Sequence, residues 1–301
     1  MADVIASPAV RSYAGRMGVD IEALAAETGR TTIAREDVDA RLNGGGGAGG
    51  APAAPAAAHS RYWEVDHASY GPVEAEPVSR IGKLAAANLS AANAMIPQVT
   101  HHDRADMRAV EALRGKLKAE AAERGVRLTA LAFHVKALAR CLRKFPRFNA
   151  SLSADGETLY LKSYVHVGIA VDTPHGLMVP VIRDADRKGL WTLGAEIADL
   201  AGRAQARKLG AAEMGGASMS ISNLGGIGGT HFSPIVNPPE VAILGLTRAE
   251  TVPVWENEAW TPVPMVPLDL TYDHRVLNGA DAARFLRAYA DLIGDPRRLM
   301  V

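Results

Sequence analysis

One histidine of this chain lies in a polar, turn-prone stretch between two apolar elements. The stretch, Thr271–Gly279, reads TYDHRVLNG and ends in an Asn-Gly pair, which is a strong turn signal. Apolar residues alternate over Val266–Leu270 before it, which predicts a strand, and Ala280–Ile293 after it has the spacing of a helix. A histidine at such a junction, His274, can act as a general base near neutral pH. The alternative is a structural histidine in a turn.

A second candidate is a serine-rich segment, Ser218–Ser222, which precedes a glycine-rich stretch. In a strand, its two apolar residues would face one way and its three serines the other. The following Asn223–Gly229 predicts a sharp turn. It does not carry the Gly-x-Gly-x-x-Gly spacing of a dinucleotide site, because position 231, three residues after Gly228, is a histidine. Taken alone, the pattern favours a polar edge strand with a flexible turn.

The other histidines give weaker signals for function. His101 and His102 are adjacent, so in a strand they would face opposite sides, which is poor geometry for a single metal ion. We therefore expect surface or core roles for this pair and no metal site. His231 closely follows the glycine-rich turn. A contact of its side chain with substrate is one interpretation, but not the favoured one.

The stretch around His274 resembles the signature Asp-His-Arg-x-x-Asp/Asn-Gly of the dihydrolipoamide acyltransferases, the core component of 2-oxoacid dehydrogenase complexes. Every position of that signature is matched, by Asp273, His274, Arg275, Asn278 and Gly279. Further stretches similar to that family follow one another in the same order: Arg80–Asn88, Met95–Thr100, Val167–Thr173, Val179–Ile182 and Ser220–Gly225. Several dispersed motifs in order are more specific than any one of them.

The resemblance implies the transfer of an acyl group between two thiols, those of dihydrolipoamide and coenzyme A. It gives His274 the role of general base, Ser222 that of a hydroxyl that stabilises the tetrahedral oxyanion, and Asn278 a supporting role in transition-state stabilisation or site geometry. Arg80 matches a family arginine near the substrate. A thiol with a pKa of about 8.5 lies only about two units above a histidine, a gap that base catalysis can bridge. The resemblance also implies a site between two subunits.

The acetyl group is the favoured acyl group, because Asp273–Phe285 resembles the pyruvate dehydrogenase members more than the succinyl-transferring ones. Two alternatives stay open: a non-catalytic scaffold that binds dihydrolipoyl dehydrogenase, and a small-molecule O-acetyltransferase of related fold. The pair of His274 and Ser222 speaks against the scaffold. No segment offers the lysine-bearing hairpin of a lipoyl domain, so we expect the lipoyl group to be supplied in trans, and a truncated chain and a natural short form are both consistent with this.

Composition narrows the class of protein. The 301 residues have equal numbers, 33 each, of basic and acidic side chains, so nothing indicates a nucleic-acid or membrane-surface partner. A single cysteine, Cys141, excludes an internal disulfide and favours a reducing compartment, the cytoplasm. It lies in the helix predicted over Leu128–Phe145, which indicates a buried core thiol rather than a nucleophile. Neither a membrane span nor a signal peptide is indicated.

The stretch 43–60 is rich in Gly, Ala and Pro and predicts a linker between two domains. Residues 3–42 before it predict a small domain of two helices. The first has Ser7 as its N-cap and Pro8 at its first position, and it ends at Gly18; the second spans Arg35–Leu42.

This small domain resembles the peripheral subunit-binding domain of the same acyltransferases, through Ala6–Arg11, Gly18–Asp20 and Arg35–Val38. The stretch Ala26–Ile33 would be its connecting loop. The resemblance implies binding of dihydrolipoyl dehydrogenase or of the 2-oxoacid decarboxylase component. Its five arginines against seven acids depart from the basic face that family members often present.

Residues 61–301 predict a catalytic domain of the α+β class, a mixed sheet covered by helices, because long helices alternate irregularly with strands. The expected helices are Arg104–Arg124, Leu128–Phe145 and Gly189–Leu209, and the expected strands are Leu159–Val171, Ala217–Ser222, Val241–Leu246 and Val266–Leu270. The resemblance implies a chloramphenicol-acetyltransferase-like fold, a homotrimer and a possible 24-subunit cage. We expect the apolar end, Arg298–Val301, to find no core in its own chain and to dock on a neighbouring trimer.

Overall fold

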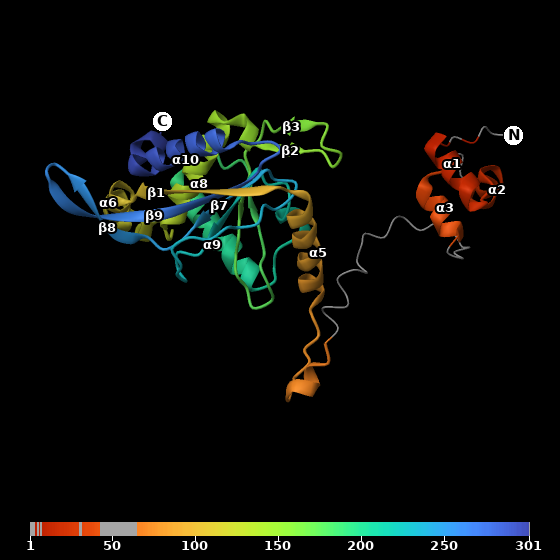
Figure 1. Ribbon diagram of the computed structural model, residues 1–301. Coiled ribbons are helices and arrows are strands. Elements are labelled where there is room, and N and C mark those ends of the chain that lie inside the picture. Colours follow the sequence, from red (N-terminus) through yellow and green to blue (C-terminus); the bar gives the residue numbers. More distant parts are fainter. Residues whose placement is uncertain (1–3, 5, 7, 30–31, 43–64, 301) are drawn as a thin grey trace. The chain divides into compact units, whose positions relative to one another are not determined.

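The computed structural model describes the chain except for residues 1–3, 5, 7, 30–31, 43–64 and 301 (Figure 1). The chain divides into two compact units, Met1–Glu76 and Pro77–Val301. The predicted linker 43–60 lies outside the described residues. Within the described ranges, no helix is long and apolar enough to cross a membrane.

The first unit is a small helical unit with its own core. Its helices are α1 (Pro8–Met17), α2 (Ile21–Thr28) and α3 (Arg35–Leu42), and a short 3-10 helix, η1 (His67–Tyr70), follows. The predicted helices at Pro8 and Arg35 are both confirmed, and Gly18 ends the first with a φ of +71°. Ser7, the predicted N-cap, lies outside the described residues. The buried core consists of small and aliphatic side chains, Ala14, Ile21, Leu24, Ala25, Ile33 and Val38.

The prediction of only two helices in this unit is wrong. The helix α2 occupies part of the predicted connecting loop, and its ends show why it forms. The carboxylate of Asp20 accepts hydrogen bonds from the backbone N–H groups of Glu22 and Ala23, at 2.9 and 3.2 Å. Gly29 ends the helix with a φ of +66°, a conformation that costs glycine little. Both caps are local signals that the sequence carries.

The second unit is built on a mixed sheet. Among the described residues this sheet has seven strands, in the order β1-β9-β7-β6-β4-β5, with β8 paired to the outer part of β9. The strands β4, β6 and β7 are parallel to one another, and the other pairs are antiparallel. The bounds are β1 (Gln98–Asp106), β4 (Val167–Ile169), β5 (Val181–Ile182), β6 (Met219–Asn223), β7 (Ala242–Leu246), β8 (Glu250–Glu256) and β9 (Ala259–Asp273). A separate hairpin pairs β2 (Ala150–Leu152) with β3 (Leu159–Leu161).

Helices cover the sheet unequally. The helices α8 (Ala130–Lys144), α9 (Leu190–Gln205) and α10 (Gly279–Gly294) pack side by side over one face (Figure 1). On the other face, the end of α5 (Arg80–Met95) contacts the sheet through a small cluster that includes Ala92 and Ile243. The remaining helices are α6 (Arg108–Lys116), α7 (Lys118–Glu123) and the short η2 (Pro146–Phe148), η3 (Ala211–Glu213) and η4 (Pro296–Leu299). The predicted α+β architecture is confirmed.

Three predictions for this unit need correction. The helix predicted over Arg104–Arg124 begins later, because residues up to Asp106 belong to β1, which pairs with β9 along its whole length. The strand predicted over Leu159–Val171 is two strands, β3 and β4, in different sheets. The C-terminal tail does find a core in its own chain, since Leu299 is buried in the main hydrophobic cluster, although Met300 is exposed. Long-range pairing overrode the local pattern in the first two cases.

Candidate active site

The turn that carries His274 is held by bonds to both of its ends. The backbone carbonyl of Asp273, the last residue of β9, accepts from the N–H groups of Val276 and Leu277, both at 3.0 Å. The carboxylate of Asp273 accepts two bonds from the guanidinium of Arg275, at 2.7 and 3.0 Å, which raises the pKa of Arg275. The N–H of His274 donates to the carbonyl of Pro97 at 3.0 Å. The imidazole is thus exposed on a fixed backbone.

Asn278 belongs to the next element rather than to this turn. Residues 274–276 form a turn and not the single turn of helix that would carry Asn278 beside His274. The side chain of Asn278 is the N-cap of α10, and its oxygen accepts from the N–H of Asp281 at 2.9 Å. The guanidinium of Arg147 donates to the carbonyl of Val276 at 2.7 Å and so holds the segment between His274 and Asn278. Asn278 therefore caps the start of α10, four residues after His274.

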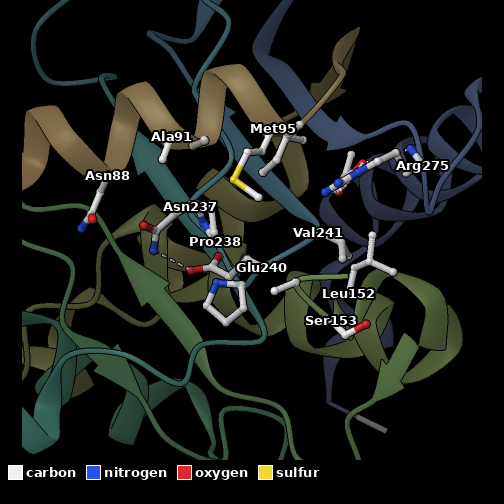
Figure 2. Close-up of a pocket in the computed structure, with 15 residues that line it drawn as sticks. Asn88, Ala91, Met95, Leu152, Ser153, Asn237, Pro238, Glu240, Val241 and Arg275 are labelled. Atoms are coloured by element: carbon white, nitrogen blue, oxygen red, sulfur yellow. Dashed lines mark hydrogen bonds and ion pairs between the residues drawn. The ribbon is translucent and has the colours of Figure 1, made fainter. Parts of the chain in front are cut away.

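A pocket of about 410 Å³ lies next to this turn. Figure 2 shows it between α5, from which Met95 points into the space, and the loop Asn237–Val241. Asp273 and Arg275 line its side nearest β9, so the pocket reaches the residues on either side of His274. His274 itself is not among the lining residues.

A buried acid, Glu240, lines this pocket. One oxygen of its carboxyl group accepts from the hydroxyl of Ser220 at 2.9 Å. The same oxygen accepts from the amide of Asn237 at 3.0 Å (Figure 2). The other oxygen has no hydrogen-bond partner among the residues that the structure describes. Burial raises the pKa of Glu240 to about 7. Sequence reasoning missed this residue, because a lone Glu after two prolines has no distinctive pattern.

Ser222 lies on a different part of the sheet. The predicted alternation in this strand is confirmed, since Met219 and Ile221 are buried in the main core and the serines lie on the opposite face. Ser222 pairs with Gly245 of β7, and Gly245 in turn pairs with Asp269 of β9. Half-buried Ser222 thus stands in a cross-strand row whose members share one face of the sheet.

Ser222 and His274 are far apart within one chain. Asp269 is the residue of β9 that lies in the same cross-strand row as Ser222. His274 follows Asp269 by five residues, which is about 16 Å along an extended strand. Across the sheet, at right angles to the strands, β6 and β9 are two strand spacings apart, about 10 Å. The two backbones are therefore roughly 19 Å apart, whereas a shared tetrahedral intermediate requires contacts of about 3 Å. One chain alone does not bring the two together.

Arg80 is also distant from His274 in the same chain. It is the exposed first residue of α5, whereas His274 bonds to Pro97, just beyond the other end of that helix. A helix of 16 residues is about 24 Å long. Within one subunit Arg80 is thus a whole helix length from the turn.

The single cysteine has no part in this site. Cys141 is buried in the core of α8, as predicted, and burial raises the pKa of its thiol to about 12. A thiol of that pKa is protonated at neutral pH and is a poor nucleophile.

Comparison with known proteins identifies the family. The model for the 2-oxoacid dehydrogenases acyltransferase (catalytic domain) matches residues 70–301. The chain belongs to this acyltransferase family. It is 46% identical over 308 residues to the dihydrolipoyllysine-residue acetyltransferase component of the pyruvate dehydrogenase complex of Pseudomonas aeruginosa, and 47% identical over 307 residues to that of Azotobacter vinelandii. These alignments cover 100% of this chain but 55% and 48% of the relatives, so the chain spans about half their length.

Solved structures of the acyltransferase family have the same fold as this chain. The Azotobacter vinelandii dihydrolipoamide acetyltransferase superimposes with a TM-score of 0.77 at 49% identity, covering 79% of this chain and 98% of the other. The cubic core of the pyruvate dehydrogenase multienzyme complex gives a TM-score of 0.77 at 50% identity with the same coverage. The catalytic fold expected from the sequence is confirmed by these similarities.

Proposed function

We propose that this chain transfers an acyl group, favouring acetyl, between the thioester of dihydrolipoamide and coenzyme A within a 2-oxoacid dehydrogenase complex. The observation that carries the proposal is the spacing of three residues. The solved Azotobacter vinelandii enzyme was studied for the roles of a serine, a histidine and an asparagine in its catalytic mechanism, and these are 52 and 4 positions apart in its chain. Ser222, His274 and Asn278 have the same two spacings.

In the proposed reaction, His274 accepts the proton of the attacking thiol. The sulfur adds to the thioester carbonyl carbon, whose oxygen becomes an oxyanion. The hydroxyl of Ser222 donates a hydrogen bond to that oxyanion. When the intermediate collapses, the carbon–sulfur bond of the leaving thiol breaks and the imidazolium of His274 returns the proton to it. Both sulfurs belong to the substrates, so no acyl-enzyme forms.

The site is completed, in this proposal, by two subunits of a homotrimer. The separation of Ser222 from His274 supports a shared site, because the His274 of one chain would then act with the Ser222 of a neighbouring chain. Exposed apolar side chains along α5 offer a surface for such an interface: Ile81, Leu84, Leu89 and Met95. Arg80, on the same helix, would bind substrate in a site to which a neighbouring chain contributes. Assembly of trimers into a 24-subunit cage is the further step, and the relative with a cubic core supports it.

We assign partner binding to the first unit. As a peripheral subunit-binding domain it would hold dihydrolipoyl dehydrogenase or the 2-oxoacid decarboxylase component, through residues 3–42. The acyl group would arrive on the lipoyl group of a lipoyl domain. The cytoplasmic location expected from the single cysteine stays a prediction.

An acyl-transfer assay tests the proposal. Acetyl-, succinyl- and branched-chain acyl-dihydrolipoamide are supplied separately as donors, with coenzyme A as acceptor, and the acyl-coenzyme A formed is measured. We expect the highest kcat/KM with acetyl-dihydrolipoamide and lower values with the succinyl and branched-chain donors. Absence of turnover with every donor, in protein that is folded and oligomeric, would support the scaffold instead. Acetylation of small hydroxylated compounds from acetyl-coenzyme A, without activity on dihydrolipoamide, would support an O-acetyltransferase.

A further inference from the structure

Two histidines and an aspartate that are distant in the sequence meet on the face of the sheet that carries Ser222. The Nδ1 atoms of His102 and His231 both lie 2.7 Å from the same carboxylate oxygen, Oδ1 of Asp269. The two imidazole rings are edge to face, with their centroids 5.0 Å apart. One potential ligand atom from each of the three residues lies within 4.8 Å of the other two. The sequence concealed this cluster, because the histidine that joins His102 is 129 positions away rather than next to it.

The fold places these three groups with little freedom. His102 of β1 and Asp269 of β9 are direct cross-strand partners, so their side chains share one face. His231 comes from the loop after β6, and this loop lies against the sheet because Gly245 has no side chain. A Cβ atom at Gly245 would be only 2.7 Å from the ring of Phe232. The N–H of Phe232 donates to Oδ2 of Asp269 at 3.2 Å, which fixes the carboxylate and directs Oδ1 at the two rings.

We propose that His102, His231 and Asp269 form a binding site for a divalent transition-metal ion of the zinc class. Two imidazole nitrogens and one carboxylate oxygen are a ligand set that zinc accepts, and three protein ligands leave one coordination position open. Asp269 is fully buried, whereas the side chains of His102 and His231 are 45% and 34% exposed. The open position therefore faces solvent, and an ion has a path to the site.

The second oxygen of the carboxylate strengthens the assignment. A metal-binding carboxylate needs a hydrogen-bond donor on its other oxygen to hold its orientation, and the N–H of Phe232 supplies it. The nitrogen–oxygen separations are 2.7 Å, and bonds of about 2.0–2.2 Å to a common tetrahedral ion require about 3.4 Å, so the two imidazoles need to move outward by about 0.7 Å. The bound ion would tie β1, β9 and the loop before β7 together. It takes no part in the acyl transfer proposed at His274.

Metal binding to the full-length chain tests the site. Purified protein is treated with chelator, and Zn²⁺ is then titrated by calorimetry and counted by elemental analysis. Co²⁺ serves as a spectroscopic probe, because a four-coordinate site gives it a strong visible spectrum. We expect one ion per chain in the wild type. Removing a group that only hydrogen-bonds to a metal ligand already lowers metal affinity by about 10–100-fold. Removing a ligand itself should have a larger effect, so His102→Ala and His231→Ala should each weaken zinc binding by more than about 100-fold.

His101→Ala is the matched control, because it removes the adjacent histidine on the opposite face of β1 and should leave zinc affinity unchanged. Thermal unfolding in chelator checks that each variant is folded. Zinc should raise the unfolding temperature of the wild type and His101→Ala, but not of the two ligand variants. Equal zinc affinity in the wild type and a His102→Ala/His231→Ala double variant would overturn the proposal. So would the absence of zinc binding by the wild type, which would leave a purely hydrogen-bonded His–Asp–His cluster.

Discussion

The turn after β9 and the middle of the same sheet carry catalytic candidates in very different settings. His274 is exposed on a turn fixed by its own backbone and by the ion pair of Asp273 with Arg275. Ser222 is half-buried inside a strand and positioned by regular pairing with β7. Bonds within a few residues build most of the first region, with further bonds to Pro97 and from Arg147, whereas the register of paired strands builds the second. The comparison teaches that the two regions we propose as half-sites lie apart in one chain and that each is held by its own set of bonds.

The largest expected effect comes from breaking the first half-site. His274→Ala should lower kcat by about 10²–10⁴-fold, the usual contribution of a general base, without loss of the fold, because the exposed imidazole packs little core. Steady-state kinetics with acetyl-dihydrolipoamide measures the effect. His101→Ala provides a histidine control that should keep full turnover. Near-normal turnover of His274→Ala across neutral pH would remove this residue from the mechanism.

Breaking the second half-site should have a smaller effect of a different kind. Ser222→Ala should lower kcat and kcat/KM together by about 10²–10³-fold, since an oxyanion donor acts mainly in the transition state. Ser220→Ala, on the same face but bonded to Glu240, is the matched control and should keep most of the turnover. A rise in KM alone for Ser222→Ala would indicate a substrate contact in place of oxyanion stabilisation.

Glu240, in the pocket near the first half-site, predicts a pH effect on stability. Burial raises its pKa from an ordinary 4.5 to about 7. The folded state therefore binds a proton that the unfolded state has released between these values, so the group's contribution to stability is present below about pH 4.5 and is lost as the pH rises through about 7. Glu240→Gln cannot ionise. Relative to the wild type, its free energy of unfolding should increase between pH 5 and pH 8 by up to about 3 kcal/mol.

Denaturant unfolding of both proteins at several pH values measures this difference. The comparison cancels the titration of all other groups, which the two proteins share. A constant difference across the range would mean that Glu240 stays ionised in the folded protein and that its free oxygen is hydrated.

The smallest effect is expected at Asn278, which joins the turn to α10. Asn278→Ala removes the N-cap and should cost about 1 kcal/mol of stability, whereas Asn278→Asp keeps an oxygen for the N–H of Asp281. If Asn278 acts through site geometry, the Asp variant should retain both stability and turnover. A stable Asn278→Asp with turnover as low as that of His274→Ala would show that the amide itself acts in the transition state.

Local signals made the first region predictable from the sequence. The alternation before His274 and the helical spacing after it have counterparts in β9 and α10, whereas the turn predicted at Asn278-Gly279 is wrong, because these two residues begin α10 and the turn consists of residues 274–276. The strand of Ser222 was also predictable, because its apolar and polar residues alternate. The caps of α2 at Asp20 and Gly29 are also local signals, so this helix too is within reach of prediction from the sequence.

Pairing between distant segments could not be predicted from local patterns. The strand β1 has polar residues typical of a helix start at Arg104 and Asp106, and only its partner β9 keeps it extended. The cluster around Asp269 and the pocket beside Glu240 depend on the same kind of long-range contact. The separation of Ser222 from His274 likewise appears only when the register of three strands is known.

The most direct test of the two half-sites is complementation between variants. Chains carrying His274→Ala and chains carrying Ser222→Ala, with different affinity tags, are co-expressed in equal amounts, and particles that contain both are isolated. If each site takes His274 from one chain and Ser222 from its neighbour in a ring of three, every trimer that contains both variants has both intact residues in one of its three sites, about one third of the total. Acetyl transfer by the mixed trimers should then recover to about a third of the wild-type rate. A mixed particle no more active than the average of the two parent variants would contradict the shared site.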